Sequence, residues 1–344
     1  MKMDFISFSV IIPVYNIEPY LKKCIDTVLQ GLDECDEIIL SLGDSCDAST
    51  DIAMNYMRAN KNIHVVRQTG KGLSNARNCA VQQAKGTYVI YVDGDDCVKV
   101  ESFRNVLEQI RHSKKDYDVY MLDYYRFDFR SGKYENQFII PEKITMTGVE
   151  SLNRILKGRG CFWNVWRYIY KRDFIEKNNI VFLENHLAED IDYTTKVLLA
   201  QPRIAFIHDP YYVYYVGRKS SLMGCPSIKN LQDTTMVLLH SIQMVSKSNM
   251  PFSEIVCTHY QFEYFLNLAL LYEIPKDDRA RGYLVLSNTK DILTIRQDPI
   301  IKLAMVIINV FGLRLTAFML HIIKILRTKK KRVTAAIAGL KTDI

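Results

Sequence analysis

The sequence lacks any close grouping of cysteine residues. Its eight cysteines are scattered, and no two of them form a Cys-x-x-Cys pair: Cys24, Cys35, Cys46, Cys79, Cys97, Cys161, Cys225 and Cys257. This spacing argues against a zinc site and against a disulfide scaffold, and it indicates a reducing compartment. A small-residue cleavage pattern is also missing after SFSVIIPV, residues 7–14. We therefore expect that stretch to be a first strand rather than part of a signal peptide.

The C-terminal segment has almost no acidic residues and no long charge-free apolar run. Residues 300–326 are strongly apolar, but their longest charge-free stretch, Leu303–Leu313, has 11 residues, short of the roughly 20 that span a bilayer. From Lys302 to the end there are nine Lys or Arg and one acid, a net charge of +8; since the whole chain carries +7, residues 1–301 carry −1. This asymmetry argues against a nucleic-acid-binding body. It predicts an amphipathic, polybasic tail over 298–344 that contacts anionic membrane lipid, or alternatively a helix docked on the rest of the chain.

The first hundred residues alternate between short apolar strands and helices. The expected strands are 9–14, 37–42, 62–67 and 88–93, and helical spacing follows each of them, with Asn16 as a plausible N-cap of the first helix. Strands that are apolar on both faces and separated by helices of this length predict right-handed crossovers. The fold class is therefore α/β, with a mostly parallel sheet flanked by helices.

The pattern changes after residue 115. DVYMLDYYRFDF, the turn RSGK and YENQFII (118–140) predict a β-hairpin. Further helices are expected near 148–157, 171–178 and 188–200, an aromatic segment follows at 209–217, and only helical patterns lie beyond residue 228.

Three carboxylates stand where the fourth strand ends, in YVIYVDGDD. Asp93 and Asp95 form an Asp-x-Asp pair, with Asp96 beside them. Such a pair can face one hard cation, and Mg²⁺ is usually held by one or two carboxylates plus substrate phosphates. Gly94 would let a bulky ligand approach the backbone. A solvated Asp-Gly turn is the alternative interpretation.

The surrounding segments resemble the family 2 glycosyltransferases, inverting enzymes of the GT-A fold. SVIIPVYN, EIILSLGDSCDAST, GKGLSNARN and YVIYVDGDD occur in the family's order over roughly the first 115 residues. The resemblance implies a Rossmann-like GT-A domain at 1–222, with nucleotide-binding and acceptor-side halves at 1–115 and 116–222, and a helical extension at 223–297 before the tail. It implies Mg²⁺ or Mn²⁺ as cofactor, held by Asp95 and Asp93, with Asp96 as a supporting carboxylate on the donor and acceptor side. It also places a set of residues at the nucleotide: Pro13, Val14, Tyr15, Asn16, Leu73, Arg77, Asn78, Asp93 and Gly94.

One departure from the family falls at the end of the second strand. The family has an aspartate pair there, one of which recognises the base, whereas this chain has Leu42 and Gly43. Asp44 stands one place late and is our candidate for the base contact, and Asp47 aligns with the motif's final aspartate. The departure bears on the nucleotide's identity more than on the reaction.

A second acidic site lies in LAEDIDYTTKVLL, residues 187–199. Inverting transfer needs a general base for the acceptor hydroxyl, and the resemblance nominates Asp190, with Glu189 as its neighbour. First-turn acids that complement a helix dipole are the alternative. The resemblance also makes Trp166 a donor or acceptor contact, and Arg218 and Ser221 candidates to close over the diphosphate.

We therefore expect a cytoplasmic glycosyltransferase, peripheral on the inner face of the cell membrane, that acts in surface polysaccharide biosynthesis. Its expected partners are a nucleotide-sugar donor, preferably a UDP-sugar, and a glycan or lipid-linked acceptor, with no nucleic acid. Two alternatives remain: a nucleotide-sugar-binding relative without turnover, and a metal-dependent nucleotidyltransferase. A dinucleotide-binding loop in GKGLSNARN is a weaker interpretation because the third glycine is missing.

Overall fold

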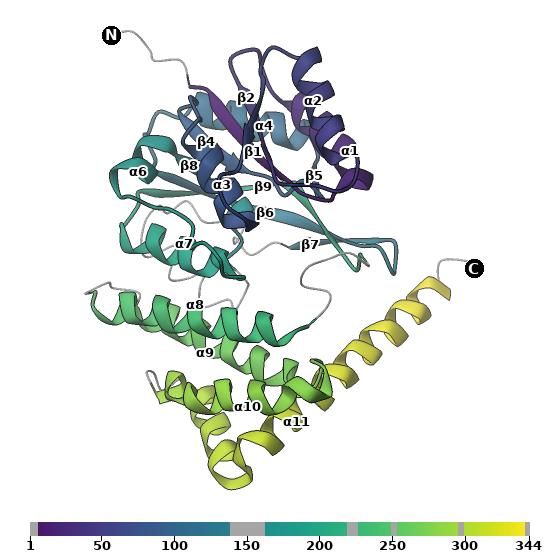
Figure 1. Cartoon of the computed structure of the whole chain (residues 1–344), viewed down its shortest axis with the longest axis vertical. Coiled ribbons are helices and arrows are strands. Elements are labelled where there is room, and N and C mark those ends of the chain that lie inside the picture. Colours follow the sequence, from purple (N-terminus) through teal and green to yellow (C-terminus); the bar gives the residue numbers. More distant parts are fainter. Residues whose placement is uncertain (1–5, 138–161, 219–225, 249–252, 295–298, 341–344) are drawn as a thin grey trace. The chain divides into compact units, whose positions relative to one another are not determined.

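The computed structural model describes residues 6–137, 162–218, 226–248, 253–294 and 299–340, and the side chains among these except at 253–254 and beyond residue 326. Figure 1 shows the chain coloured along its sequence. It divides into two compact units, Met1–Gly217 and Arg218–Ile344, which are described separately below.

The first unit contains a mixed sheet with the strand order β3-β2-β1-β4-β8-β6-β9-β5, and β7 pairs with β6. Its N-terminal half is parallel and consists of β1 (Phe8–Val14), β2 (Glu37–Leu42), β3 (Ile63–Arg67) and β4 (Tyr88–Tyr91). Strands β1, β2 and β4 are buried along their whole length. This burial on both faces is why these segments are apolar nearly throughout rather than alternating.

The chain reverses its direction across the sheet after β3. Helices α1 (Glu18–Gly31) and α2 (Ser49–Ala59) connect β1 to β2 and β2 to β3, and α3 (Gly72–Val81) then leads back past β1 to β4. Right-handed crossovers therefore place α3 on the face of the sheet opposite to α1 and α2. The carboxyl ends of β1 and β4 form a topological switch point, which is where open α/β sheets bind ligands.

The other half of the sheet is mixed. β8 is antiparallel to β4 and to β6, β9 is parallel to β6, and β5 is antiparallel to β9. These strands are β5 (Cys97–Val98), β6 (Val119–Asp128), β7 (Lys133–Gln137), β8 (Tyr168–Lys171) and β9 (Ile204–Val216). The associated helical segments are α4 (Val100–Arg111), the 3₁₀ turn η1 (Val165–Arg167), α6 (Arg172–Lys177) and α7 (Glu189–Leu199).

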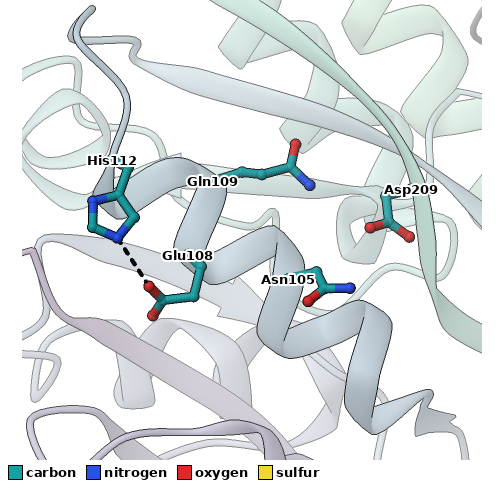
Figure 2. Close-up of a pocket in the computed structure, with 5 residues that line it drawn as sticks. All are labelled: Asn105, Glu108, Gln109, His112 and Asp209. Carbon is teal, nitrogen blue, oxygen red and sulfur yellow. Dashed lines mark hydrogen bonds and ion pairs between the residues drawn. The ribbon is translucent and has the colours of Figure 1, made fainter.

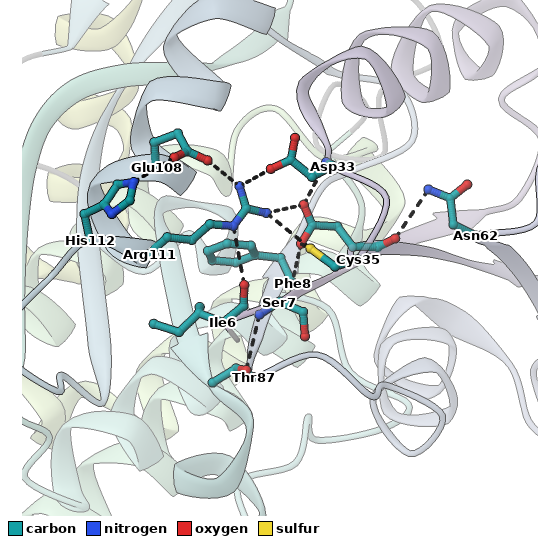
Figure 3. Close-up of polar contacts among 11 residues, drawn as sticks. Ile6, Ser7, Phe8, Asp33, Cys35, Asn62, Thr87, Glu108, Arg111 and His112 are labelled. Atoms are coloured by element: carbon teal, nitrogen blue, oxygen red, sulfur yellow. Dashed lines mark hydrogen bonds and ion pairs between the residues drawn. The ribbon is translucent and has the colours of Figure 1, made fainter. Parts of the chain in front are cut away.

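An arginine at the end of α4 links residues at the amino-terminal ends of β1 and β2. Arg111 contacts the carboxylates of Asp33, Asp36 and Glu108 at 2.6, 2.5 and 2.7 Å (Figure 3). Asp36 is buried and also accepts hydrogen bonds from the backbone N–H groups of Phe8 and Asp33, both at 2.9 Å. A buried carboxylate with these partners is satisfied. We therefore assign this cluster a structural role.

The second unit is helical. Its described elements are α8 (Ile228–Ser246), α9 (Ser253–Leu270), η3 (Lys276–Asp278), α10 (Arg279–Asn288), η4 (Lys290–Thr294) and α11 (Pro299–Leu340). Helix α9 packs against both α8 and α11. Two buried side chains on α9 bind carbonyl groups of α10 and η4: Tyr264 donates to Leu286 of α10, and Gln261 donates to Ile292 of η4.

Most of the elements expected from the sequence are confirmed, including the four N-terminal strands, the hairpin of β6 and β7, and the helices beyond residue 228. The helix expected at 148–157 lies outside the described residues. The expected N-cap at Asn16 is wrong: Ile17 caps α1, whereas Asn16 has a φ of 50° and its side-chain oxygen accepts the Cys46 N–H at 2.8 Å. The two-residue strand β5 was not expected.

Candidate active site

The three acids after β4 have two different environments. Asp96 is 1% exposed and accepts hydrogen bonds from the Tyr212 hydroxyl at 2.8 Å and the Tyr215 N–H at 2.9 Å. Tyr212 in turn accepts the Asp93 N–H at 3.1 Å. Asp96 therefore fixes the turn against β9. The side chains of Asp93 and Asp95 are half-buried, so they remain accessible at the switch point.

Gly94 is required by the protein's own packing. A Cβ at this position would lie 2.4 Å from the Ile17 side chain and 2.7 Å from the Pro13 carbonyl oxygen. This packing is a reason for a glycine that does not depend on a ligand, and the expected approach of a ligand to Gly94 stays a prediction. The glycine lets the ends of β1 and β4 approach each other, which brings the nucleotide-side loop next to the acids.

A buried arginine joins the two acidic segments. Arg77 on α3 is 1% exposed, and its Nη2 contacts Asp93 at 2.7 Å. Its Nη1 contacts both Glu189 and Asp190 at 2.9 Å. A planar guanidinium suits this role because its donors have a fixed fork geometry. The resemblance places Arg77 near the nucleotide, which stays a prediction; the structure shows that its guanidinium contacts three carboxylates.

Glu189 and Asp190 are the first two residues of α7. The preceding Ala188 has a φ of 64°, in the left-handed region that non-glycine residues seldom adopt. Asp190 also accepts the Val165 N–H at 3.2 Å, and its side chain is 19% exposed. The acid is thus held on one side by Arg77 and on another by the 3₁₀ turn η1, with part of its carboxylate accessible.

The electrostatic environment makes Asp190 a base that can work near neutral pH. Burial raises the pKa of Asp190 to about 7, against the lowering effect of the Arg77 charge; the neighbouring Glu189 and Asp93 charges raise it further. Burial also raises the pKa of Glu189, again opposed by Arg77. A catalytic base is most effective when its pKa lies near the working pH.

The loop after β1 presents the expected nucleotide-side residues. Pro13 and Val14 are buried at the end of β1, and Tyr15 is 60% exposed. Gly43 lies beneath Tyr15, because a Cβ there would come within 3.0 Å of the Tyr15 ring. Asp44 is exposed, and no residue among those described hydrogen-bonds or ion-pairs with its carboxylate.

Asp47 has structural partners instead. It accepts the N–H groups of Glu18 and Ser49, both at 3.0 Å. Of the two carboxylates after β2, Asp44 is therefore the one available to a ligand.

Asn78 and Leu73 lie on α3 beside Arg77. Asn78 accepts the Phe182 N–H at 2.9 Å and donates to the Phe182 carbonyl and to Glu184. It thus ties the segment before α7 to α3, which helps to set where Asp190 lies. Leu73 is partly exposed in the first turn of the same helix.

The remaining expected residues are less accessible or not described. Trp166 is 2% exposed and stacks on Tyr212 with ring centroids 4.3 Å apart. It supports the tyrosine that holds Asp93 and Asp96, and it does not present a free face to a ligand. Arg218 is buried at the start of the second unit, and Ser221 lies outside the described residues. Their roles stay predictions.

The donor set at Asp93 and Asp95 fits a hard divalent cation with few protein ligands. The part of the chain that the structure describes contains no group of three or more His, Cys, Asp or Glu side chains arranged to hold a metal. Two carboxylates leave most coordination positions to phosphate oxygens and water, which is the usual arrangement for Mg²⁺. Such a site would bind its cation together with a diphosphate.

Two surface hollows lie elsewhere on the first unit. One is lined by Asn105, Glu108 and Gln109 of α4, by His112 directly after that helix, and by Asp209 of β9 (Figure 2). The other lies among the residues near the Arg111 cluster, including Cys35, Lys61 and His64. Neither hollow contains Asp93, Asp95, Arg77 or Asp190, so neither hollow is part of the carboxylate site.

Two functional contacts were missed in the sequence. Tyr212, which bridges the Asp93 N–H and the Asp96 carboxylate, was only part of an aromatic segment. The three-way contact of Arg77 depends on where α7 lies in the fold. The only available signal was that an arginine stood in the same α3 motif as the expected nucleotide contacts.

Solved structures define the class of fold. The S. aureus TarS 1–349 structure in complex with UDP-GlcNAc matches 92% of this chain and 89% of that chain, with a TM-score of 0.67 and 19% identity. The mannosyltransferase PcManGT from Pyrobaculum calidifontis, in complex with GDP-Man and Mn²⁺, covers 93% of this chain and 86% of its own, with a TM-score of 0.55 and 15% identity. The fold is that of the GT-A glycosyltransferases.

Sequence comparison gives the family. Residues 9–186 match the model of glycosyl transferase family 2. The uncharacterized glycosyltransferase EpsJ of Bacillus subtilis is 31% identical over 214 residues, which are 60% of this chain and 60% of EpsJ. The match thus spans less than two thirds of that relative. Since the family model covers more than half of the chain, the chain belongs to glycosyl transferase family 2.

Proposed function

We propose that the protein transfers a sugar from a nucleotide-sugar donor to a glycan or lipid-linked acceptor, with inversion at the anomeric carbon. The observation that supports this most is the convergence of two acidic segments on one buried arginine. Arg77 contacts Asp93 from the turn after β4 and Asp190 from the start of α7. A donor bound at the switch point would therefore lie beside a carboxylate that can accept a proton.

The reaction is a single displacement. The acceptor hydroxyl oxygen attacks the anomeric carbon on the face opposite the diphosphate, and a new carbon–oxygen bond forms as the bond to the diphosphate breaks. The departing diphosphate keeps the electron pair of the broken bond. Asp190 takes the hydroxyl proton, since its pKa of about 7 leaves a large fraction ionised at neutral pH.

Asp93 and Asp95 would hold Mg²⁺ or Mn²⁺ together with the donor diphosphate. A divalent cation bound there supplies charge neutralisation to the leaving diphosphate. The protein's own contribution is to keep the two carboxylates in place: Arg77 holds the Asp93 side chain, and Tyr212 holds its backbone N–H. The presence of Mn²⁺ in the PcManGT complex is consistent with this assignment.

We further propose a UDP-sugar as the donor, as TarS binds UDP-GlcNAc, and surface polysaccharide assembly on the cytoplasmic side as the setting. The test is a screen of nucleotide sugars for turnover of the donor, with and without added Mn²⁺ or Mg²⁺. We expect one donor to be consumed in a metal-dependent way. Nucleotide-sugar binding without turnover of any donor would contradict the proposal and favour a binding protein.

Replacing Asp95 by asparagine should weaken the binding of UDP in the presence of Mn²⁺ much more than in its absence. The reason is that a neutral amide is a poorer ligand for a hard cation than a carboxylate. Calorimetric titration of UDP with and without Mn²⁺ measures this independently of turnover. The matched control is Asp173→Asn, because Asp173 on α6 is 75% exposed. Equal losses with and without the metal would show that Asp95 contacts the nucleotide directly.

Asp44→Asn should weaken UDP binding by about 10-fold to 100-fold, the range for losing a hydrogen bond to a charged group. The exposed Asp44 carboxylate at the end of β2 is the candidate contact to the base. Asp51→Asn, an exposed acid in the first turn of α2, is the control. Binding constants for UDP, GDP and CDP measure the effect. If Asp44→Asn binds all three nucleotides as tightly as the unaltered protein does, the Asp44 carboxylate does not contact the base.

A further inference from the structure

Helix α11 presents an apolar surface that the rest of the second unit leaves uncovered. The most apolar 18-residue window of its segment Pro299–Leu326 has a mean hydropathy of 2.0, yet only 22% of that window is buried. A core helix of a soluble domain would be mostly covered. The exposure therefore needs an explanation beyond the packing of this unit.

The buried and exposed residues of α11 lie on different faces. The buried face, which packs towards α9, includes Ile301, Ile308, Leu313 and Ala317. The exposed apolar side chains are between 36% and 68% accessible, and they are Ile300, Leu303, Val306, Val310, Phe311, Leu315, Phe318, Met319, Ile322, Ile323, Ile325 and Leu326. We call these twelve residues the α11 apolar face. Large exposed apolar side chains in this number mark a contact with another apolar phase or partner.

Three of the four basic residues in the apolar run are engaged by other parts of the unit, and the fourth, Lys302, is exposed near the start of the run. Lys324 contacts Glu273 at 2.6 Å, and His321 lies 3.7 Å from the same carboxylate. The Arg314 guanidinium lies over the Tyr283 ring, 4.3 Å from its centroid. These contacts draw the basic groups towards α10 and the end of α9. They leave the α11 apolar face with little charge of its own.

The geometry of α11 favours lying along a surface over crossing a bilayer. Gly312 has φ 74° and ψ 161°, so the helix is kinked there. Each apolar segment, 299–311 and 313–326, is about 20 Å long at 1.5 Å per residue. Neither reaches the roughly 30 Å thickness of a hydrocarbon core. An interfacial helix needs only one apolar face.

The sequence that follows supplies the complementary charge. Arg327, Lys329, Lys330, Lys331 and Arg332 come directly after the apolar segment, and no acid lies between Pro299 and Thr342. Clusters of this kind are attracted to the headgroups of anionic lipid. We propose that the α11 apolar face lies in the interface of an anionic lipid bilayer, with the basic run on the headgroups.

The experiment measures binding of the full-length protein to vesicles by flotation. Vesicles of phosphatidylcholine with phosphatidylglycerol are compared with vesicles of phosphatidylcholine alone. We expect strong binding to the anionic vesicles and weak binding to the neutral ones. Val310→Asp should reduce binding at least about tenfold, because it places a charge at the most exposed position of the apolar face. Reversal of Lys329, Lys330 and Lys331 to glutamate should reduce it on the order of 100-fold.

The matched control is Leu284→Asp, which changes an exposed apolar residue on α10, at 58% against 68% for Val310, outside the α11 apolar face. It should bind as the unaltered protein does. Three outcomes would overturn the proposal: Val310→Asp binding as well as the control, a dimer in solution that Val310→Asp dissociates, or resistance to alkaline carbonate extraction, which indicates a spanning helix. None of these readouts depends on sugar transfer.

Discussion

Replacing Asp190 by asparagine should lower kcat for sugar transfer by about 10²-fold to 10⁴-fold, the range for losing a general base. The binding of the nucleotide sugar should change little, because Asp190 is assigned to the acceptor's proton and not to the donor. Arg77 would keep Glu189 and Asp93 as partners, so the fold should survive. Steady-state kinetics and calorimetric titration of the donor measure the two effects separately.

The pH dependence gives an independent check on the same residue. Only the ionised carboxylate can accept a proton, and burial raises the pKa of Asp190 to about 7. The value of kcat should therefore fall as the pH decreases through about 7 and level off at higher pH. This acid limb should be absent from the residual activity of Asp190→Asn. If Asp190→Asn, like the surface control Asp173→Asn, keeps near-normal kcat, another residue is the base.

Arg77→Met should strongly destabilise the folded protein, the second of the two largest effects that we expect. It leaves three carboxylates close together without the guanidinium that they share. Removing one partner from a buried charge cluster costs about 3–5 kcal/mol of folding free energy. Loss of the Arg77 charge should also raise the pKa of Asp190, since that charge is the main influence that lowers it. The acid limb of kcat should therefore move to higher pH.

Arg77→Lys separates positioning from charge. Lysine keeps the positive charge but lacks the planar guanidinium with its several N–H donors. It therefore cannot hold Asp93 and Asp190 in the same geometry. We expect kcat to fall on the order of 100-fold, since small displacements of catalytic groups have costs of this size. The Kd for the nucleotide, measured without added metal, should stay close to normal, as it should in the exposed control Arg58→Lys.

A different result would restore the role expected from the sequence. If Arg77→Lys mainly raises the Kd for UDP measured without metal and leaves kcat and its pH profile unchanged, Arg77 contacts the nucleotide. The combination of kcat, Kd and pH profile is needed because a purely structural residue would alter stability alone.

The parallel half of the fold could be predicted because each of its strands and helices is marked by residues within its own stretch of sequence. Strands β1, β2 and β4 are apolar nearly throughout since both of their faces are covered, and turn residues separate them from amphipathic helices. The pairing of β6 with β9 and of β5 with β9 could not be predicted, because those contacts join segments far apart in the chain.

The same distinction applies to the candidate site. The acids at 93–96 and 189–190 could be found as motifs, but Arg77 joins them only because α3 and α7 meet in the folded chain. Asn16 was misjudged as a helix cap because a capping residue was expected before α1, whereas its side chain binds the Cys46 N–H across two loops. The packing of Gly94 against Pro13 and Ile17 could not be predicted either, because it depends on how closely the ends of β1 and β4 approach.

The most direct test of the central claim is the anomeric configuration of the sugar that is first released from its nucleotide. The measurement is proton NMR during donor hydrolysis in the presence of Mn²⁺, begun before the released sugar equilibrates between its anomers. A single displacement in the site of Asp93, Asp95 and Asp190 predicts that an α-linked nucleotide sugar yields the β-anomer first. First release of the α-anomer would contradict the account.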